Sequence, residues 1–380
     1  MNILFYEYGL NPFTGGVQRV SYNIAKQLKG EHSTYVCYTT NEEYKSAYNE
    51  AFTGHINIKD LSSASHKSLL EFIKSNRISV IINQCGCELE HTSFLYGVKQ
   101  EYDFKLYSFV HISPTGSRDV LGYRDFNFPK LVFRSIVKEF VFLFYKADSK
   151  RFREIYRISD KVILLSKYHV DEFKHIIHSK DEASKIMAIP NMVPFPPQNE
   201  NIIVCKRKKI LVVARMGETV KRLSRVLYAW NHLHKDLTDW DLTFVGDGSE
   251  LPKFKELARK MNLPRLTFTG STNSQKYYED ASIFLMTSAS EGFPMTILEA
   301  MQFGVVPIVM DSCKSFHEMI DNGENGFLTP NKSLSVFETQ IMELANDNVK
   351  RQQMASNAMK STSAFYPEAI INLWKQLLKA

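Results

Sequence analysis

The sequence has no apolar run that approaches the ~20 residues needed for a membrane-spanning helix, and its longest candidate, residues 140–145, is far shorter. The N-terminus has no basic stretch followed by an apolar run and a small-residue cleavage site, so we expect no secretory signal. The five cysteines are scattered, and the spacing of Cys85 and Cys87 fits neither a redox pair nor a zinc site. We therefore expect buried or free thiols in a cytoplasmic protein and no bound metal.

Motifs for two other classes of protein are missing. The segment FVGDG at 244–248 starts like a dinucleotide-binding fingerprint, but Leu251 stands where the third glycine would be. A nicotinamide-dependent dehydrogenase is therefore disfavoured. No zinc-finger or RNA-binding motif is present, so nucleic acid is not an expected partner.

The length and composition suit a folded globular protein. The 380 residues are enough for two domains, and 44% hydrophobic with 23% charged residues is an ordinary balance. Short β-rich runs alternate with helical spacing, which indicates βαβ units and parallel sheets. We expect strands at 1–6, 34–38, 79–83, 105–111, 161–166, 209–213, 242–245, 266–268, 283–286 and 306–310. We expect helices at 17–28, 69–74, 221–234, 251–261, 277–280, 294–303 and 367–378.

A proline-rich segment, IPNMVPFPPQN, divides the chain, because proline disrupts both helices and sheet interiors. We predict an α/β protein with two doubly wound, Rossmann-like domains, residues 1–190 and 209–360, joined by a linker at 191–208 and facing a central cleft. Ligands of such sheets bind beyond the carboxyl ends of the strands. The last segment, 361–380, either completes the second domain or crosses back to the first.

The strongest candidate for a site is the start of one helix in the second domain. Pro294 suits a first helical turn, and Gly304 suits the position just past the helix end. The N–H groups near Gly292, Phe293 and Met295 would then point out of the helix N-terminus. Such an arrangement is suited to a diphosphate.

Two carboxylates flank this helix start. Glu291 precedes it, and Glu299 lies about one and a half turns inside it. Carboxylates accept hydrogen bonds from sugar hydroxyls, although both could instead be solvated. The segment EGFPMTILEAM resembles the E-x7-E motif of family four of the retaining glycosyltransferases (GT4), which have the two-domain GT-B fold. The resemblance implies that Glu291 contacts the donor sugar and Glu299 the ribose hydroxyls, while the backbone of 292–295 meets the sugar and diphosphate.

Further landmarks of that family follow along nearly the whole chain. Arg215 and Lys221 resemble the two cations that hold the donor diphosphate, although Ala214 stands where the family usually has glycine. Cations just past a strand end could neutralise a leaving diphosphate. Either one could also be an ordinary surface charge. The family's nucleobase loop corresponds to Gly270, Ser271 and Thr272.

Two landmarks fall in the first domain. Gly15 and Gly16 resemble the glycine-rich first loop of the family, where the backbone approaches phosphate or sugar; a tight turn is the alternative. His111 ends a strand and resembles the active-site histidine near the donor sugar. Ile112 stands where the family often has an acidic residue. A structural histidine is the alternative.

One segment is strongly basic. Residues 130–161 hold nine Lys or Arg and four Asp or Glu, in a chain of net charge +6. Lys130, Arg134 and Lys138 repeat every four residues and would share a helix face. The segment is also rich in apolar and aromatic residues, which suits peripheral contact with an anionic membrane surface. The alternative is a helix that packs its apolar side into its own domain.

The residues and the resemblance together predict a retaining, metal-independent hexosyltransferase that uses a UDP- or GDP-sugar. The acceptor would be a glycan, with or without a lipid carrier, in assembly of a bacterial capsule, O-antigen or exopolysaccharide. No cofactor is expected, and the protein would lie in the cytoplasm or at the inner face of the cell membrane. The predicted catalytic residues are Glu291, His111, Arg215 and Lys221. The alternatives are a sugar-nucleotide epimerase or glycan phosphorylase of the same fold and a non-catalytic nucleotide-sugar-binding protein.

Overall fold

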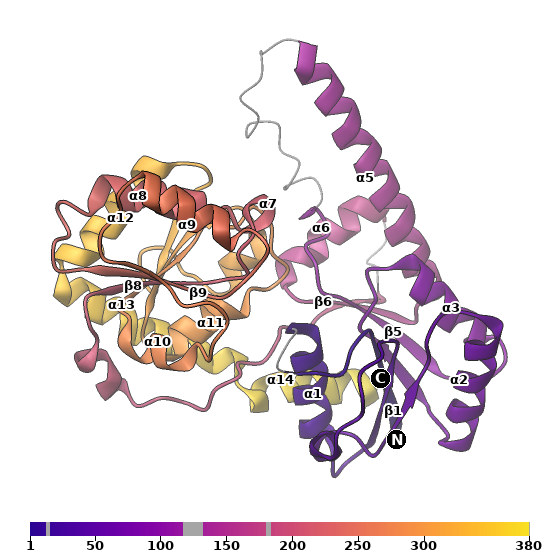
Figure 1. Ribbon diagram of the computed structural model, residues 1–380. Helices are drawn as coiled ribbons and strands as arrows, with labels where there is room; N and C mark the ends of the chain where they lie inside the picture. Colours follow the sequence, from indigo (N-terminus) through magenta and orange to yellow (C-terminus); the bar gives the residue numbers. More distant parts are fainter. Residues whose placement is uncertain (13–15, 117–131, 180–183, 380) are drawn as a thin grey trace. The chain divides into compact units, whose positions relative to one another are not determined.

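The chain forms two compact units in the computed structural model (Figure 1). Residues 1–12, 16–116, 132–179 and 184–379 are described, with the backbone alone for 132–144. Unit 1 comprises Met1–Met192 and Pro367–Ala380, and unit 2 comprises Val193–Tyr366.

Unit 1 is built on a parallel sheet of seven strands in the order β3-β2-β1-β4-β5-β6-β7. The strands are β1 (Asn2–Glu7), β2 (Ser33–Tyr38), β3 (Gly54–Asn57), β4 (Val80–Asn83), β5 (Lys105–Val110), β6 (Lys161–Leu164) and β7 (Ile186–Ala188). The helices described in this unit are α1 (Gly16–Leu28), α2 (Ser63–Ser75), α3 (Leu89–Lys99), α5 (Val132–Ile158), α6 (Lys167–Ile177) and α14 (Pro367–Lys379), with a 3-10 turn at Ser46–Glu50.

Unit 2 is built on a parallel sheet of six strands in the order β10-β9-β8-β11-β12-β13. The strands are β8 (Lys209–Val213), β9 (Asp241–Val245), β10 (Leu266–Phe268), β11 (Ile283–Met286), β12 (Val306–Asp311) and β13 (Phe327–Pro330). The helices are α7 (Glu218–Lys221), α8 (Ser224–Leu233), α9 (Leu251–Lys260), α10 (Gln275–Asp280), α11 (Met295–Gln302), α12 (Leu334–Asn346) and α13 (Asn348–Ser361). Shorter 3-10 turns lie at Glu200–Cys205, Lys314–Glu318 and Thr362–Phe365.

The central strands of both sheets are apolar runs that are buried along their whole length. β4 reads VIIN and β11 reads IFLM, with every residue buried. Such runs form where helices cover both faces of a parallel sheet. In each sheet the strand order reverses at the first strand of the unit, between β1 and β4 and between β8 and β11. Open α/β sheets bind ligands at this switch point, so the loops that follow β8 and β11 are the natural place for a site in unit 2.

The last helix, α14, packs into unit 1 although it follows unit 2 in the chain. It contacts α1, and the Trp374 ring meets the Phe109 ring of β5 edge-on, with 5.6 Å between their centroids. Lys375 forms an ion pair with Glu31. Trp374 is fully buried, which indicates that α14 is part of the unit 1 core.

All ten predicted strands are present, and the predicted α/β class with two parallel-sheet units is confirmed. The predicted single helix at 221–234 is wrong, because Arg222 adopts a left-handed conformation with φ 52° and separates α7 from α8. Three strands were not predicted, including β3, whose sequence GHIN has no apolar run. Residues 193–208 cluster with unit 2, and Ile203 joins its hydrophobic core.

Candidate functional site

The start of α11 presents backbone donors at an edge of the unit 2 sheet. Among the described residues, the N–H groups of Gly292, Phe293 and Met295 donate no hydrogen bond. Pro294 is the N-cap, with φ −72° and ψ 105°, and so lies one position before the first turn in which we predicted it. Gly304 has φ 66°, as its predicted position past the helix end requires. The helix therefore starts with unpaired N–H groups, whose partial positive charge suits an anion.

An ion pair lies beside this helix start. The Nζ atom of Lys221 is 2.6 Å from Oε1 of Glu291, and the two side chains are 22% and 13% exposed. The loops that carry them are joined, because the N–H of Ala289 donates to the carbonyl of Val220 at 2.7 Å. The N–H of Glu291 also donates to Sγ of Cys313 at 3.0 Å. The interpretation of Lys221 and Glu291 as solvated surface charges is therefore wrong.

Arg215 lies in the loop after β8 and is exposed. The loop that carries Arg215 packs against the two glycines of FVGDG. A side chain at either glycine would collide with the backbone of that loop. A Cβ atom on Gly246 would lie 2.0 Å from the carbonyl oxygen of Ala214, and one on Gly248 would lie 2.5 Å from that of Met216. The segment FVGDG is thus an incomplete dinucleotide fingerprint whose two glycines let the Arg215 loop approach the loop after β9.

Glu299 is buried, with 5% of its surface exposed, and its Oε2 accepts a hydrogen bond of 2.8 Å from the hydroxyl of Tyr278. The alternative of a solvated Glu299 is therefore wrong. Tyr278 is fully buried and stacks on Phe303, with 6.0 Å between ring centroids. No sequence pattern indicates a role for Tyr278, because a tyrosine in the short helix QKYYED has no distinguishing spacing.

The predicted nucleobase loop joins the same edge of the sheet. Gly270 has φ 72°, and its carbonyl accepts a 3.0 Å hydrogen bond from the N–H of Gly246. Ser271 and Thr272 follow it and are exposed. The loops after β8, β9, β10 and β11 thus lie together. The site residues that we predicted for unit 2 lie in these loops or in the helices that follow them, with Lys221 in α7 and Met295 and Glu299 in α11.

The two described candidates in unit 1 are His111 and Gly16, while Gly15 lies outside the described residues. His111 follows β5, and its Nε2 is 2.5 Å from Oε1 of Gln84, which follows β4 and is 3% exposed. Because a carbonyl oxygen only accepts, this contact places the ring hydrogen on Nε2 and leaves Nδ1 as an acceptor. Burial lowers the pKa of His111 to about 3, so the ring is neutral at physiological pH. Gln84 is a partner that the sequence analysis missed. Gly16 is exposed at the start of α1.

Two features are absent from the described part of the chain. No group of three or more His, Cys, Asp or Glu side chains there could hold a metal ion. No helix there is long and apolar enough to cross a bilayer.

Comparisons with known proteins show similar sequences and similar folds. Residues 198–361 match the family model of the glycosyl transferases group 1, and this match covers nearly all of unit 2. The amylovoran biosynthesis glycosyltransferase AmsD of Erwinia amylovora is 26% identical over 230 residues, which cover 59% of this chain and 63% of AmsD. An uncharacterized glycosyltransferase of Haemophilus influenzae is 29% identical over 222 residues, which cover 58% of this chain and 61% of that protein. The chain thus spans about three fifths of these curated relatives.

Solved structures show that the likeness extends to both units. The structure of Anabaena Alr3699/HepE in complex with UDP covers 100% of both chains with a TM-score of 0.76 at 17% identity. TarM of S. aureus, in complex with fondaparinux, alpha-GlcNAc-glycerol and UDP, has a TM-score of 0.75 at 13% identity and covers 100% of both chains. The two parallel-sheet units therefore have the GT-B glycosyltransferase fold, as the sequence predicted.

Proposed function

We propose that this protein is a retaining, metal-independent glycosyltransferase that moves a hexosyl-type sugar from a UDP- or GDP-sugar to an acceptor hydroxyl. The observation that carries the proposal is the Lys221–Glu291 pair beside the open N–H groups of α11, in a unit that matches the family model of the glycosyl transferases group 1. A cation and a helix N-terminus suit a diphosphate, and a carboxylate suits the hydroxyls of a sugar. UDP in the structures of Alr3699/HepE and TarM favours UDP as the nucleotide of the donor.

In the proposed reaction, Arg215, Lys221 and the α11 N-terminus stabilise charge on the departing diphosphate in place of a metal ion. The acceptor oxygen bonds to the anomeric carbon on the face that the diphosphate leaves, and the leaving oxygen keeps the electron pair of the broken bond. The acceptor proton passes to a donor phosphate oxygen. Glu291 orients the sugar, and Glu299, oriented by Tyr278, accepts from ribose hydroxyls. Neutral His111 contributes a hydrogen bond near the sugar instead of a positive charge.

The acceptor that we propose is a glycan, with or without a lipid carrier, in bacterial surface polysaccharide assembly. The support is the name of AmsD, a glycosyltransferase of amylovoran biosynthesis. We also propose that the protein works in the cytoplasm, at the inner face of the cell membrane.

The first test is a thermal-shift screen of the full chain against UDP, GDP, ADP and their sugars, with and without a chelator. A ligand at a hundred times its Kd stabilises the folded state by about 2.7 kcal/mol. We expect one nucleotide to raise Tm with and without chelator, and Arg215→Ala or Glu299→Ala to abolish the shift. Arg259→Ala, which removes an exposed cation of α9 paired with Glu256, is the matched control and should keep it.

The outcomes separate the alternatives. No shift with any nucleotide would contradict the donor site. A shift that disappears with chelator would contradict metal independence. Consumption of the sugar nucleotide to an isomeric sugar nucleotide without acceptor would identify an epimerase, and binding without any turnover in the presence of acceptor glycans would favour a binding protein.

A further inference from the structure

The second half of α5 has an exposed face that consists of cations. Lys146, Lys150, Arg153 and Arg157 are all exposed and follow the spacing i, i+4, i+7 and i+11. This spacing places them along one side of a helix, over roughly 16 Å at 1.5 Å per residue. We call these four residues the basic face. It lies wholly within unit 1 and far along the sequence from the donor loops.

The charge of this face is little compensated within the described residues. Lys146 and Lys150 form no ion pair there, and Arg153 donates to the carbonyl and hydroxyl of Ser149 in its own helix. Arg157 pairs with Glu154, with 2.6 Å between Nη2 and Oε1. Three of the four positive charges therefore have no carboxylate partner in the described chain. Such a face attracts anions from solution.

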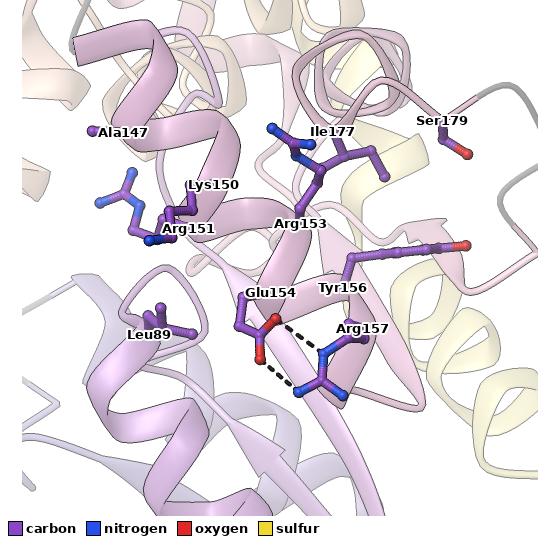
Figure 2. A pocket seen from close by; sticks show the side chains of 10 residues that line it. All are labelled: Leu89, Ala147, Lys150, Arg151, Arg153, Glu154, Tyr156, Arg157, Ile177 and Ser179. Carbon is purple, nitrogen blue, oxygen red and sulfur yellow. Dashed lines mark hydrogen bonds and ion pairs between the residues drawn. The ribbon is translucent and has the colours of Figure 1, made fainter. Parts of the chain in front are cut away.

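An open hollow of about 820 Å³ borders the basic face, and most of its wall is apolar. Figure 2 shows its lining side chains on α5, with Glu154 and Arg157 joined by hydrogen bonds and Tyr156 extending from the same helix. Leu89 of α3, Ala147 of α5 and Ile177 of α6 also line it. Lys150, Arg153 and Arg157 border the hollow, so their methylene stems can contribute apolar surface while their charged ends stay in water.

The combination of a basic face with an apolar wall distinguishes between two kinds of anionic partner. A soluble anionic polymer would use the cations but would have no use for an apolar wall. A phospholipid surface uses both, because phosphate headgroups meet Lys and Arg while stems and amphipathic rings such as Tyr156 lie at the boundary with the acyl chains. We propose that the basic face docks unit 1 on an anionic phospholipid membrane. This inference goes beyond the proposed transfer reaction, and it names four described residues within the segment 130–161 for which we predicted membrane contact. The predicted face of Lys130, Arg134 and Lys138 lies outside the residues whose side chains the structure describes.

The test is co-sedimentation of the full chain with vesicles, which measures no transfer and so can fail independently of the proposed function. One set of vesicles is phosphatidylcholine alone, and the other mixes phosphatidylcholine with phosphatidylglycerol. We expect binding to the mixed vesicles only, and we expect it to weaken as salt is added. Each Lys or Arg near an anionic surface contributes about fivefold to binding, so Lys150→Glu/Arg153→Glu should weaken it by at least about twenty-five-fold.

The matched control is Lys67→Glu/Lys74→Glu, which changes the net charge equally at two exposed lysines of α2, also in unit 1. It should retain more binding than the α5 variant by about tenfold or more. Circular dichroism establishes that both variants are folded. Equal loss in both variants, or equal binding to both kinds of vesicle, would overturn the proposal. Binding to dextran sulfate without binding to mixed vesicles would also overturn it, in favour of an anionic polymer.

Discussion

Lys221 and Glu291 have two roles in the proposed site: each contacts the donor, and each neutralises the charge of the other. Each side chain neutralises the other at 2.6 Å in a partly buried position. Removing one partner of such a pair leaves the other charge uncompensated, which is costly in a buried setting. A single substitution therefore mixes loss of ligand contact with loss of local structure. Exposed Arg215, which makes no ion pair among the described residues, reports on phosphate binding more directly.

A histidine outside the site should contribute to the loss of stability of unit 1 in acid. His169 in α6 is fully buried, neither ring nitrogen has a hydrogen-bond partner among the described residues, and burial lowers its pKa to about 4. Because the unfolded chain binds a proton near pH 6.5 and the folded chain does not, stability falls as pH drops from 6.5 to 4. We expect His169→Leu to remove roughly 2 kcal/mol of the wild-type loss between pH 7 and pH 5.

Urea unfolding at the two pH values measures this difference. His175→Leu is the control, because His175 is an exposed residue of the same helix. It should lose stability on acidification as the wild type does. If His169→Leu loses as much stability as the wild type between pH 7 and pH 5, then burial of the neutral ring is not the cause.

The loop after β9 is shaped by a glycine that a side chain cannot replace. Gly246 has φ 130°, and a Cβ atom there would lie 2.0 Å from the carbonyl oxygen of Ala214 in the Arg215 loop. Backbone cannot move aside as a flexible side chain can, so Gly246→Ala must shift one of the two loops. We expect a loss of more than about 3 kcal/mol of stability together with weaker nucleotide binding.

Gly323→Ala is the control for this prediction. Gly323 also has a positive φ, 89°, but a Cβ atom there meets nothing within 4 Å. That variant should lose only the roughly 1 kcal/mol of an unfavourable left-handed residue. Urea unfolding and thermal shift with nucleotide measure both effects. Equal losses at the two positions would show that the contact with Ala214 is not what requires glycine.

The chain passes from unit 1 to unit 2 after Met192 and returns at Pro367, so the C-terminal helix stabilises the domain in which the chain begins. Trp374 is fully buried and packs on Phe109 of β5. Truncating a buried tryptophan to alanine costs about 3–5 kcal/mol. We expect Trp374→Ala to lower amide hydrogen-exchange protection in β5 while leaving β8 unchanged.

Trp230→Ala provides the reciprocal case, since Trp230 is 2% exposed in the core of unit 2. It should lower protection in β8 and leave β5 unchanged. Loss of protection in both strands for both variants would mean that the units unfold as one cooperative block.

Sequence patterns did not predict the contacts between segments that lie far apart in the chain. Glu291, Glu299, Arg215 and Lys221 could be predicted as site residues because motif and helix-start chemistry are local in sequence. Tyr278 and Gln84 were missed, because their roles come from contacts with Glu299 and His111 that join residues 21 and 27 positions apart. The break at Arg222 was also missed, since a left-handed arginine has no reliable local signal.

Apolar runs, proline placement and the EGFPMTILEAM segment were sufficient to predict two parallel-sheet units and the helix that starts the site, because period and turn chemistry act over a few residues. The chain's return through α14 to unit 1, the pairing of Lys221 with Glu291 and the burial of Glu299 required the folded structure. The sequence of an amphipathic helix shows that its apolar face must be covered. It does not show which surface of the protein covers that face. That choice depends on packing between segments that lie far apart in the chain.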